Sequence, residues 1–102
     1  MYKLNSTNWE YLCATESSSK ISFLLYNNGG NSNRIGKKVN VAITTGWQHW
    51  TFTYDGTGST GDNSGMKMYI NGVEAGSYTS SNNGSYTAMN NTNVNLEIGA
   101  AT

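Results

Sequence analysis

Residues 46–56 read GWQHWTFTYDG, and this stretch decides the fold. Aromatic side chains recur at every second position, at Trp50, Phe52 and Tyr54, with polar or small residues between them. Successive side chains of a β-strand point to opposite faces, so this period-2 pattern predicts a strand that begins near Trp47 and buries one aromatic face.

A β-hairpin is predicted immediately after this strand. Apolar and polar residues alternate over 66–70 (MKMYI) and again over 73–76 (VEAG), and only Asn71 and Gly72 separate the two runs. Asn-Gly tolerates positive φ at both positions, as the type I′ turn of a two-residue hairpin requires. The two runs are therefore expected to pair antiparallel.

Other short runs extend the pattern toward both ends of the chain. Strands are predicted over residues 11–15, 21–26, 39–43 and 95–99, the last with Leu96 and Ile98 on one apolar face. Gly, Asn, Ser and Thr disfavour helix interiors, so no long helix is expected. Seven or so short strands separated by Gly/Asn-rich turns predict a single all-β domain over residues 1–102, an antiparallel sandwich or barrel.

The composition supports a folded β-protein and excludes several classes. Asn, Ser, Thr and Gly contribute 51 of 102 residues, yet the formal net charge is zero and seven Tyr, three Trp and four Met replace the scarce aliphatics. No apolar run approaches the roughly 20 residues that span a bilayer, and the N-terminus lacks the blocks of a signal peptide. Balanced charge predicts no nucleic-acid partner, and a single cysteine, Cys13, permits no internal disulfide.

Three motifs together carry a family resemblance. Residues 46–56, then 66–73 (MKMYINGV), then 96–100 (LEIGA) resemble the concanavalin A-like lectin/glucanase superfamily, and within it the laminin-G-type module. The resemblance covers about residues 46 to 100 and implies a jelly-roll sandwich of two antiparallel sheets. Trp50-Thr51 stands where the family prefers Val-Ala, so the core near this strand is expected to be repacked.

The chain is also short for the family, and we expect a truncated or minimal version of the fold. Strands before Asn8-Trp9-Glu10 and after Ile98-Gly99 are expected to be missing. Missing terminal strands would leave unpaired N–H and C=O groups on a sheet edge, a template for pairing with another chain. The prediction is a homo-oligomer that joins sheets through exposed edges.

The acidic residues do not suggest catalysis. A glucanase of this fold needs two carboxylates about 5 Å apart, on alternate residues of one strand. No two of the six acids lie two or four positions apart; they are Glu10, Glu16, Asp55, Asp62, Glu74 and Glu97. The chain is therefore predicted not to be an enzyme, and no cofactor is expected.

Calcium is the one metal ion for which the sequence suggests a binding site. An EF-hand loop starting at Asp55 would need Glu at its twelfth position, which is Met66. The resemblance implies that Asp55 or Asp62 contributes to a calcium site at a loop rim. The alternative, a solvated hairpin loop over residues 55–65, is favoured because carboxylates are few.

Candidate ligand contacts are Trp47, His49, Tyr78 and Tyr86. The two tyrosines lie in a long polar connection, residues 77–95, where Asn side chains and aromatic faces supply the chemistry that sugars need. Each has a structural alternative: His49 packing locally, Trp47 at the core rim, and the tyrosines in an ordinary surface loop. Cys13 is expected to be a buried small hydrophobe.

The leading hypothesis is a non-catalytic recognition module that binds glycan or a protein surface, in an extracellular, cell-surface or phage protein, without membrane insertion. The alternative is a structural or oligomerisation domain with no ligand of its own. A remnant of a glycoside hydrolase comes third. N-x-S/T sequons at Asn5, Asn83 and Asn90 are no more than the composition predicts.

Overall fold

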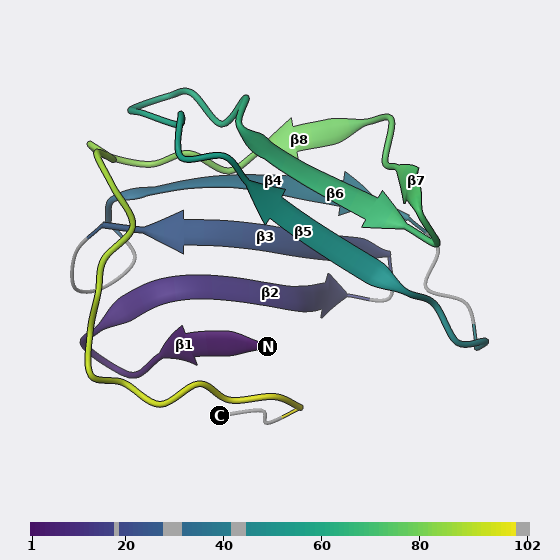
Figure 1. Ribbon diagram of the computed structural model, residues 1–102, viewed down its shortest axis with the longest axis horizontal. Helices are drawn as coiled ribbons and strands as arrows, with labels where there is room; N and C mark the ends of the chain where they lie inside the picture. Colours follow the sequence, from purple (N-terminus) through teal and green to yellow (C-terminus); the bar gives the residue numbers. More distant parts are fainter. Residues whose placement is uncertain (18, 28–31, 42–44, 100–102) are drawn as a thin grey trace.

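Two antiparallel sheets pack face to face in the computed structural model, which describes residues 1–17, 19–27, 32–41 and 45–99 (Figure 1). The larger sheet has the order β1-β2-β3-β4-β8, with bounds Tyr2–Leu4, Trp9–Ser17, Lys20–Tyr26, Arg34–Asn40 and Tyr78–Ser80. The smaller sheet has the order β5-β6-β7, with bounds Trp50–Tyr54, Met66–Ile70 and Val73–Glu74. The described residues contain no helix, and so none that is long and apolar enough to cross a membrane. The predicted sandwich is confirmed.

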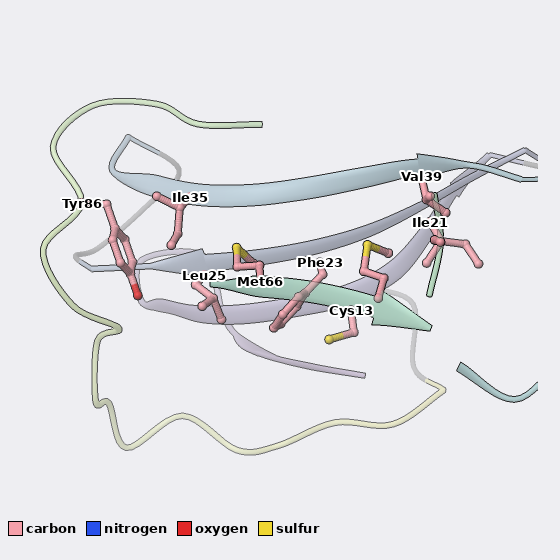
Figure 2. Packing of buried hydrophobic residues seen from close by; sticks show 10 residues of the cluster. Cys13, Ile21, Phe23, Leu25, Ile35, Val39, Met66 and Tyr86 are labelled. Atoms are coloured by element: carbon pink, nitrogen blue, oxygen red, sulfur yellow. The ribbon is translucent and has the colours of Figure 1, made fainter. Parts of the chain in front are cut away.

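The core lies between the two sheets. Figure 2 shows its buried side chains, which come from inward positions of β3, β4 and β6 together with Cys13 of β2, Ala75 and Tyr86. The inward residues of β3 are Ile21, Phe23 and Leu25. As predicted, Cys13 is a buried small hydrophobe, and burial raises the pKa of its thiol to about 11.

The deciding stretch folds as its pattern predicts. The three aromatic residues of β5 pack against the core, and the rings of Phe23 and Phe52 lie 5.4 Å apart, centroid to centroid. The turn from β6 to β7 has φ of 51° at Asn71 and 82° at Gly72, both positive, as a type I′ turn requires. The strand itself begins at Trp50, so Trp47 precedes it.

Strand β3 is covered on both faces. On the face away from the small sheet, Leu24 leans over Gly36 of β4, where an added Cβ would lie only 2.2 Å from the Leu24 Cδ2 atom. Farther along, Lys38 of β4 reaches across β3 to Glu16 of β2, with Nζ 2.7 Å from Oε1. This ion pair lies over Ser22, which is fully buried.

The strand predicted over residues 39–43 is displaced in the structure. Strand β4 begins at Arg34 and ends at Asn40, pairing with β3 along its whole length, while residues 42–44 lie outside the described part of the chain. The first part of β4 was not predicted because Lys37, a charged residue, occupies an inward position between Ile35 and Val39 and breaks the apolar alternation. Its ammonium crosses to the smaller sheet and donates to the Met66 carbonyl at 2.7 Å.

The expectation that no strand precedes Asn8 is wrong, because a short strand, β1, lies there. The strand expected to be missing after Ile98-Gly99 would fall on residues 100–102, which lie outside the described part of the chain. Before that motif, the chain returns to pair with β1 at Tyr2 and Glu97. This pairing is a single bridge and not the predicted strand over 95–99. Leu96 and Ile98 are 51% and 77% exposed, because the inward residue here is Glu97, whose Oε2 accepts a hydrogen bond from the Tyr2 hydroxyl at 2.7 Å.

Candidate functional site

The four sequence-predicted ligand residues do not come together. Trp47 is fully exposed and His49 is exposed, both on the segment that leads into β5. The backbone of His49 is held by Asn71: its N–H donates to Asn71 Oδ1 at 2.9 Å, and its carbonyl accepts from the Asn71 N–H at 2.8 Å. The indole and imidazole are therefore presented to solvent from an anchored backbone.

Tyr78 braces the two sheets. Its hydroxyl accepts from the Met68 N–H at 3.2 Å and donates to the Met68 carbonyl at 3.1 Å. The Lys37 ammonium lies 4.5 Å from the centre of its ring, a cation–π arrangement. Both the hydroxyl and one ring face are thus occupied within the protein.

Tyr86 is part of the core. It is 1% exposed, and Figure 2 shows its ring at one end of the cluster, near Ile35. Burial raises the pKa of its hydroxyl well above the ordinary value. Its ring is not available to a ligand on the surface, so Tyr86 does not serve the role that the sequence suggested.

A polar pocket lies elsewhere, between the turn from β1 to β2 and the segment over residues 90–94. It has a volume of about 550 Å³ and is open to solvent. Five of its seven lining residues are asparagines; the full lining is Asn5, Asn8, Asn90, Asn91, Thr92, Asn93 and Val94. This lining contains no charged side chain.

One wall of this asparagine pocket is a turn that Asn5 closes on itself. The Asn5 Oδ1 atom accepts hydrogen bonds from the N–H groups of Asn8 at 2.8 Å and Thr7 at 3.0 Å, while its own N–H donates to the Asn8 carbonyl at 2.8 Å. Asparagine is favoured here because its side chain imitates a backbone acceptor. The turn therefore holds a defined shape without apolar packing.

The opposite wall is fixed by a buried carboxylate. Glu10 is 3% exposed, and its Oε1 accepts from the Thr92 N–H, from the Thr92 hydroxyl at 2.7 Å and from the Lys3 ammonium at 2.9 Å. Burial by itself raises the pKa of Glu10, but the hydrogen bonds from Thr92 and Lys3 outweigh it and lower the pKa. Glu10 is therefore an ionised anchor beneath the pocket wall.

Two asparagines of the pocket have side chains that make no hydrogen bond to another described residue. Asn91 and Asn93 are exposed, and no hydrogen bond joins either side chain to another described residue. An amide offers two donor hydrogens and an acceptor oxygen, which matches a hydroxyl that both donates and accepts. The free amides are thus suited to a neutral, hydroxyl-rich ligand.

The loop considered for calcium uses its carboxylates locally. Asp55 Oδ1 accepts from the Thr57 hydroxyl at 2.6 Å and the Thr57 N–H at 2.9 Å, and these bonds lower its pKa. Asp62 Oδ1 accepts from the Ser64 N–H at 2.8 Å. Within the described ranges, no three acidic, His or Cys side chains gather as a metal site would need.

Sequence reasoning missed the pocket asparagines. The run Asn90-Asn91-Thr92-Asn93 lies in the long polar connection that the sequence singles out, but the ligand contacts predicted there are Tyr78 and Tyr86. With 15 asparagines in the chain, no local signal distinguishes these from the others. Only the fold brings this run beside the Asn5–Asn8 turn.

Comparison with known proteins now adds the family. A family model, Laminin_G_3, described as concanavalin A-like lectin/glucanases superfamily, matches residues 2–102. Laminin G-like domains are generally non-catalytic and commonly extracellular, although the superfamily includes glycosidases. Neither the curated proteins nor the solved structures gave a match. With its family match, its three motifs and its two antiparallel sheets, this chain belongs to the concanavalin A-like lectin/glucanase superfamily as a laminin G-like module.

Proposed function

We propose that this chain is a non-catalytic recognition module that binds a neutral carbohydrate in the asparagine pocket, as part of an extracellular, cell-surface or phage protein. The observation that carries the proposal is a pocket lined by five asparagines, two of which have no bond to another described residue. Its volume lies within the range of small-molecule sites, about 300–1,000 Å³. The uncharged lining favours neutral sugars over acidic ones.

The supports of the pocket match its proposed role. Thr92, a residue of the pocket wall, is hydrogen-bonded to the buried Glu10. The turn at Asn5 is closed by the Asn5 side chain. The donors and acceptors of the free amides are therefore held on backbone that does not need to rearrange. Preorganisation of this kind lowers the entropic cost of binding.

Trp47 and His49 are kept as candidate contacts for a second part of a long glycan. The segment that carries them leads into β5 at one end of the molecule, whereas the β1–β2 turn lies at the other, along a longest dimension of 35 Å (Figure 1). A single sugar in the asparagine pocket therefore does not touch Trp47. An exposed indole supplies an apolar face for a sugar ring.

The test is a glycan array followed by calorimetry on any ligand found. Asn91→Ala and Asn93→Ala are expected to weaken binding about five- to tenfold each, since each removes hydrogen bonds to the ligand worth about 1 to 1.4 kcal/mol. The matched control is Asn40→Ala, an exposed asparagine at the end of β4, which should bind like the wild type. Equal affinity of all three variants for the ligand would overturn the pocket as the site.

The alternative function is a structural or oligomerisation domain with no ligand. It is favoured by one observation, the exposed apolar residues Leu96 and Ile98 on the outermost segment of the larger sheet. Silence across a broad array of neutral polysaccharides would support this alternative. A residual hydrolase, the third hypothesis, would release reducing ends from β-glucans, and we expect none because the pocket lining holds no carboxylate.

A further inference from the structure

Strand β5 is one edge of the smaller sheet, and the larger sheet extends past it. The rings of Phe23 and Phe52 are in contact, which places β5 over β3, and β2 and β1 lie beyond the free side of β5 (Figure 1). Figure 1 shows no other described segment in front of β2 beside this edge. Neighbouring strands of a sheet lie about 4.8 Å apart, so a strand added beside β5 would lie over β2.

The backbone bonds at the two ends of β5 show which of its residues face the open side. The His49 carbonyl accepts from the Asn71 N–H at 2.8 Å just before the strand. The Asp55 N–H donates to the Gly65 carbonyl at 3.2 Å just after it. Both bonds face β6, and because backbone groups of an antiparallel strand alternate in direction, residues 51 and 53 face it too. The remaining three, the edge residues, turn their N–H and C=O groups to the open side: Trp50, Phe52 and Tyr54.

Met68, the partner of Phe52 in β6, confirms this direction. Its N–H donates to the Tyr78 hydroxyl at 3.2 Å, and its carbonyl accepts from the Ala75 N–H at 2.9 Å, so both groups point away from β5. Phe52 and Met68 are therefore a non-hydrogen-bonded pair of the ladder. No hydrogen bond joins the backbone of an edge residue to another described residue. The open side of β5 thus presents a donor and an acceptor from each edge residue.

The side chains of the edge residues are open on the same side. Met66 and Met68 belong to β6, which has a neighbour on each side, and both are 0% exposed. Trp50, Phe52 and Tyr54 also pack against the core but remain partly exposed. An inward side chain of an edge strand is covered from one side only, so a strand added beside β5 would bury aromatic surface that is now in water.

The surface under the added strand defines which side chains that strand carries. The inward residues of β2 are Tyr11, Cys13 and Thr15, since they pair with the inward residues of β3. Tyr11 is partly exposed and Thr15 is exposed. The ammonium of Lys3, which pairs with Tyr11, is already held by Glu10 at 2.9 Å. These residues offer aromatic, thiol and methyl surface and no unpaired charge, which favours apolar side chains above them.

We propose that the open edge of β5 binds an extended peptide of a partner protein, which adds a fourth, antiparallel strand to the smaller sheet over β2. The paired stretch of the peptide is neutral and carries β-branched apolar side chains at alternate positions. Backbone hydrogen bonds supply the affinity, and the alternate side chains supply the selectivity. A folded copy of this chain would meet the projecting β2 and β1, whereas a single strand fits beside β5. This surface is separate from the asparagine pocket, so the proposal goes beyond glycan binding.

Amide hydrogen exchange of the whole chain, followed by NMR, tests this edge. The probe is a synthetic peptide as long as β5, in which Thr and Val alternate between two terminal lysines. In the free protein the N–H groups of Trp50, Phe52 and Tyr54 should exchange fast, whereas those of Thr51 and Thr53, bonded to β6, should exchange slowly. The peptide at about 1 mM should slow the three edge amides about tenfold and leave the other two unchanged.

Two N-methylated forms of the peptide are matched controls. The valines face β2, so their N–H groups point to β5, and those of the threonines point away. The peptide methylated at its valine amides should therefore give no protection, while the peptide methylated at its threonine amides should protect like the parent. Equal protection by both forms would overturn the proposal. So would slow exchange of the edge amides in the free protein, or unchanged exchange with the parent peptide at about 1 mM.

A protein variant tests the position of the peptide over β2. Thr15→Lys places an unpaired charge under the peptide and should weaken its binding at least about fivefold. The control is Thr79→Lys, the same change at an exposed position of β8, which should bind the peptide like the wild type. Both threonines are exposed, so both variants are expected to keep the melting temperature of the wild type. Equal affinity of the two variants would contradict a strand over β2.

Discussion

Asn63 and Asn91 carry the same side chain in opposite situations. Asn63 is 9% exposed, and its Nδ2 lies 2.5 Å from the Gly36 carbonyl and 3.2 Å from both Ser80 Oγ and Asn82 Oδ1. Asn91 is exposed and bonds to no other described residue. A buried amide has to be bonded inside the protein, whereas an exposed one can be kept for a ligand. Burial and bonding therefore separate the asparagines that hold the fold from those that can bind a ligand. The amino-acid composition does not make this distinction.

The largest expected effect on stability is at Asn63, the buried member of the comparison. Asn63→Ala removes the bonds that join the β5–β6 loop to β4 and β8, and leaves the Gly36 carbonyl without the Asn63 amide. We expect the free energy of unfolding to fall by about 2–3 kcal/mol, a loss of roughly 8–20 °C in melting temperature. Urea unfolding measures it, and a loss below about 0.5 kcal/mol would show that water replaces the amide.

Glu10→Gln comes next, because it removes the charge of the anchor beneath the pocket. The free energy of unfolding at pH 7 should fall by about 1–2 kcal/mol, since the Lys3 ammonium and the Thr92 N–H lose a charged acceptor. The folded pKa of Glu10 is lowered, so its contribution is present above the unfolded value, about 4.3, and is lost as the pH falls through the folded value.

Urea titrations at pH 7, 4.5 and 3 check this sign. The stability difference between the wild type and Glu10→Gln should be largest at pH 7 and should shrink on acidification. A difference that grows as the pH falls would contradict the assignment of an ionised Glu10. Glu16→Gln is the comparison for an exposed acid, whose ion pair with Lys38 should contribute less than about 1 kcal/mol.

Asn5→Ala is intermediate, because Asn5 both lines the pocket and closes its own turn. Loss of the bonds from its Oδ1 to the N–H groups of Thr7 and Asn8 should lower the free energy of unfolding by about 1 kcal/mol. Asn5→Asp, which keeps the acceptor, should restore most of this loss. If Asn5→Ala and Asn5→Asp are equally stable, the side-chain acceptor is not what holds the turn.

The smallest expected effect on stability is at Asn91, the exposed member of the comparison. Asn91→Ala should change the free energy of unfolding by less than about 0.5 kcal/mol, while it weakens glycan binding. Thermal unfolding with and without the array ligand separates the two quantities: the variant should melt like the wild type alone, but show a smaller ligand-induced rise. A destabilised Asn91→Ala would mean that this amide is structural after all.

The strands could be predicted where side-chain alternation and turn chemistry agree. The aromatic alternation of β5 and the Asn71-Gly72 turn each fix one local geometry, and the structure confirms both. The prediction for β4 was displaced because Lys37 faces inward, where its ammonium is bonded to the Met66 carbonyl, and a charged residue breaks the apolar alternation. Leu96 and Ile98 were predicted to share one apolar face, but hydrophobicity does not show whether a shared face points inward, and both residues are exposed.

The candidate site was harder to predict than the fold. Trp47 is predicted as a ligand contact, with a place at the core rim as the alternative, and the structure leaves it fully exposed. Tyr78 and Tyr86, predicted as ligand contacts as well, are engaged inside the protein. A tyrosine in a polar segment can turn inward whenever a backbone group or core space accepts it, and the sequence does not show that partner. The asparagine pocket is made of two segments more than 80 positions apart, so only the tertiary structure reveals it.

The bond from Tyr2 to Glu97 spans 95 positions, and the anchor from Glu10 to Thr92 spans 82. Closing so long a loop costs entropy that is recovered only when the strands between are already in place, so these contacts are expected to form late in folding. Refolding followed by a fluorescent pocket ligand should then lag behind refolding followed by intrinsic tryptophan emission, and coincident traces would exclude a late closure. If the closure is late, the contacts between residues 2–10 and residues 92–97 close last. Only a completely folded molecule then has the asparagine pocket.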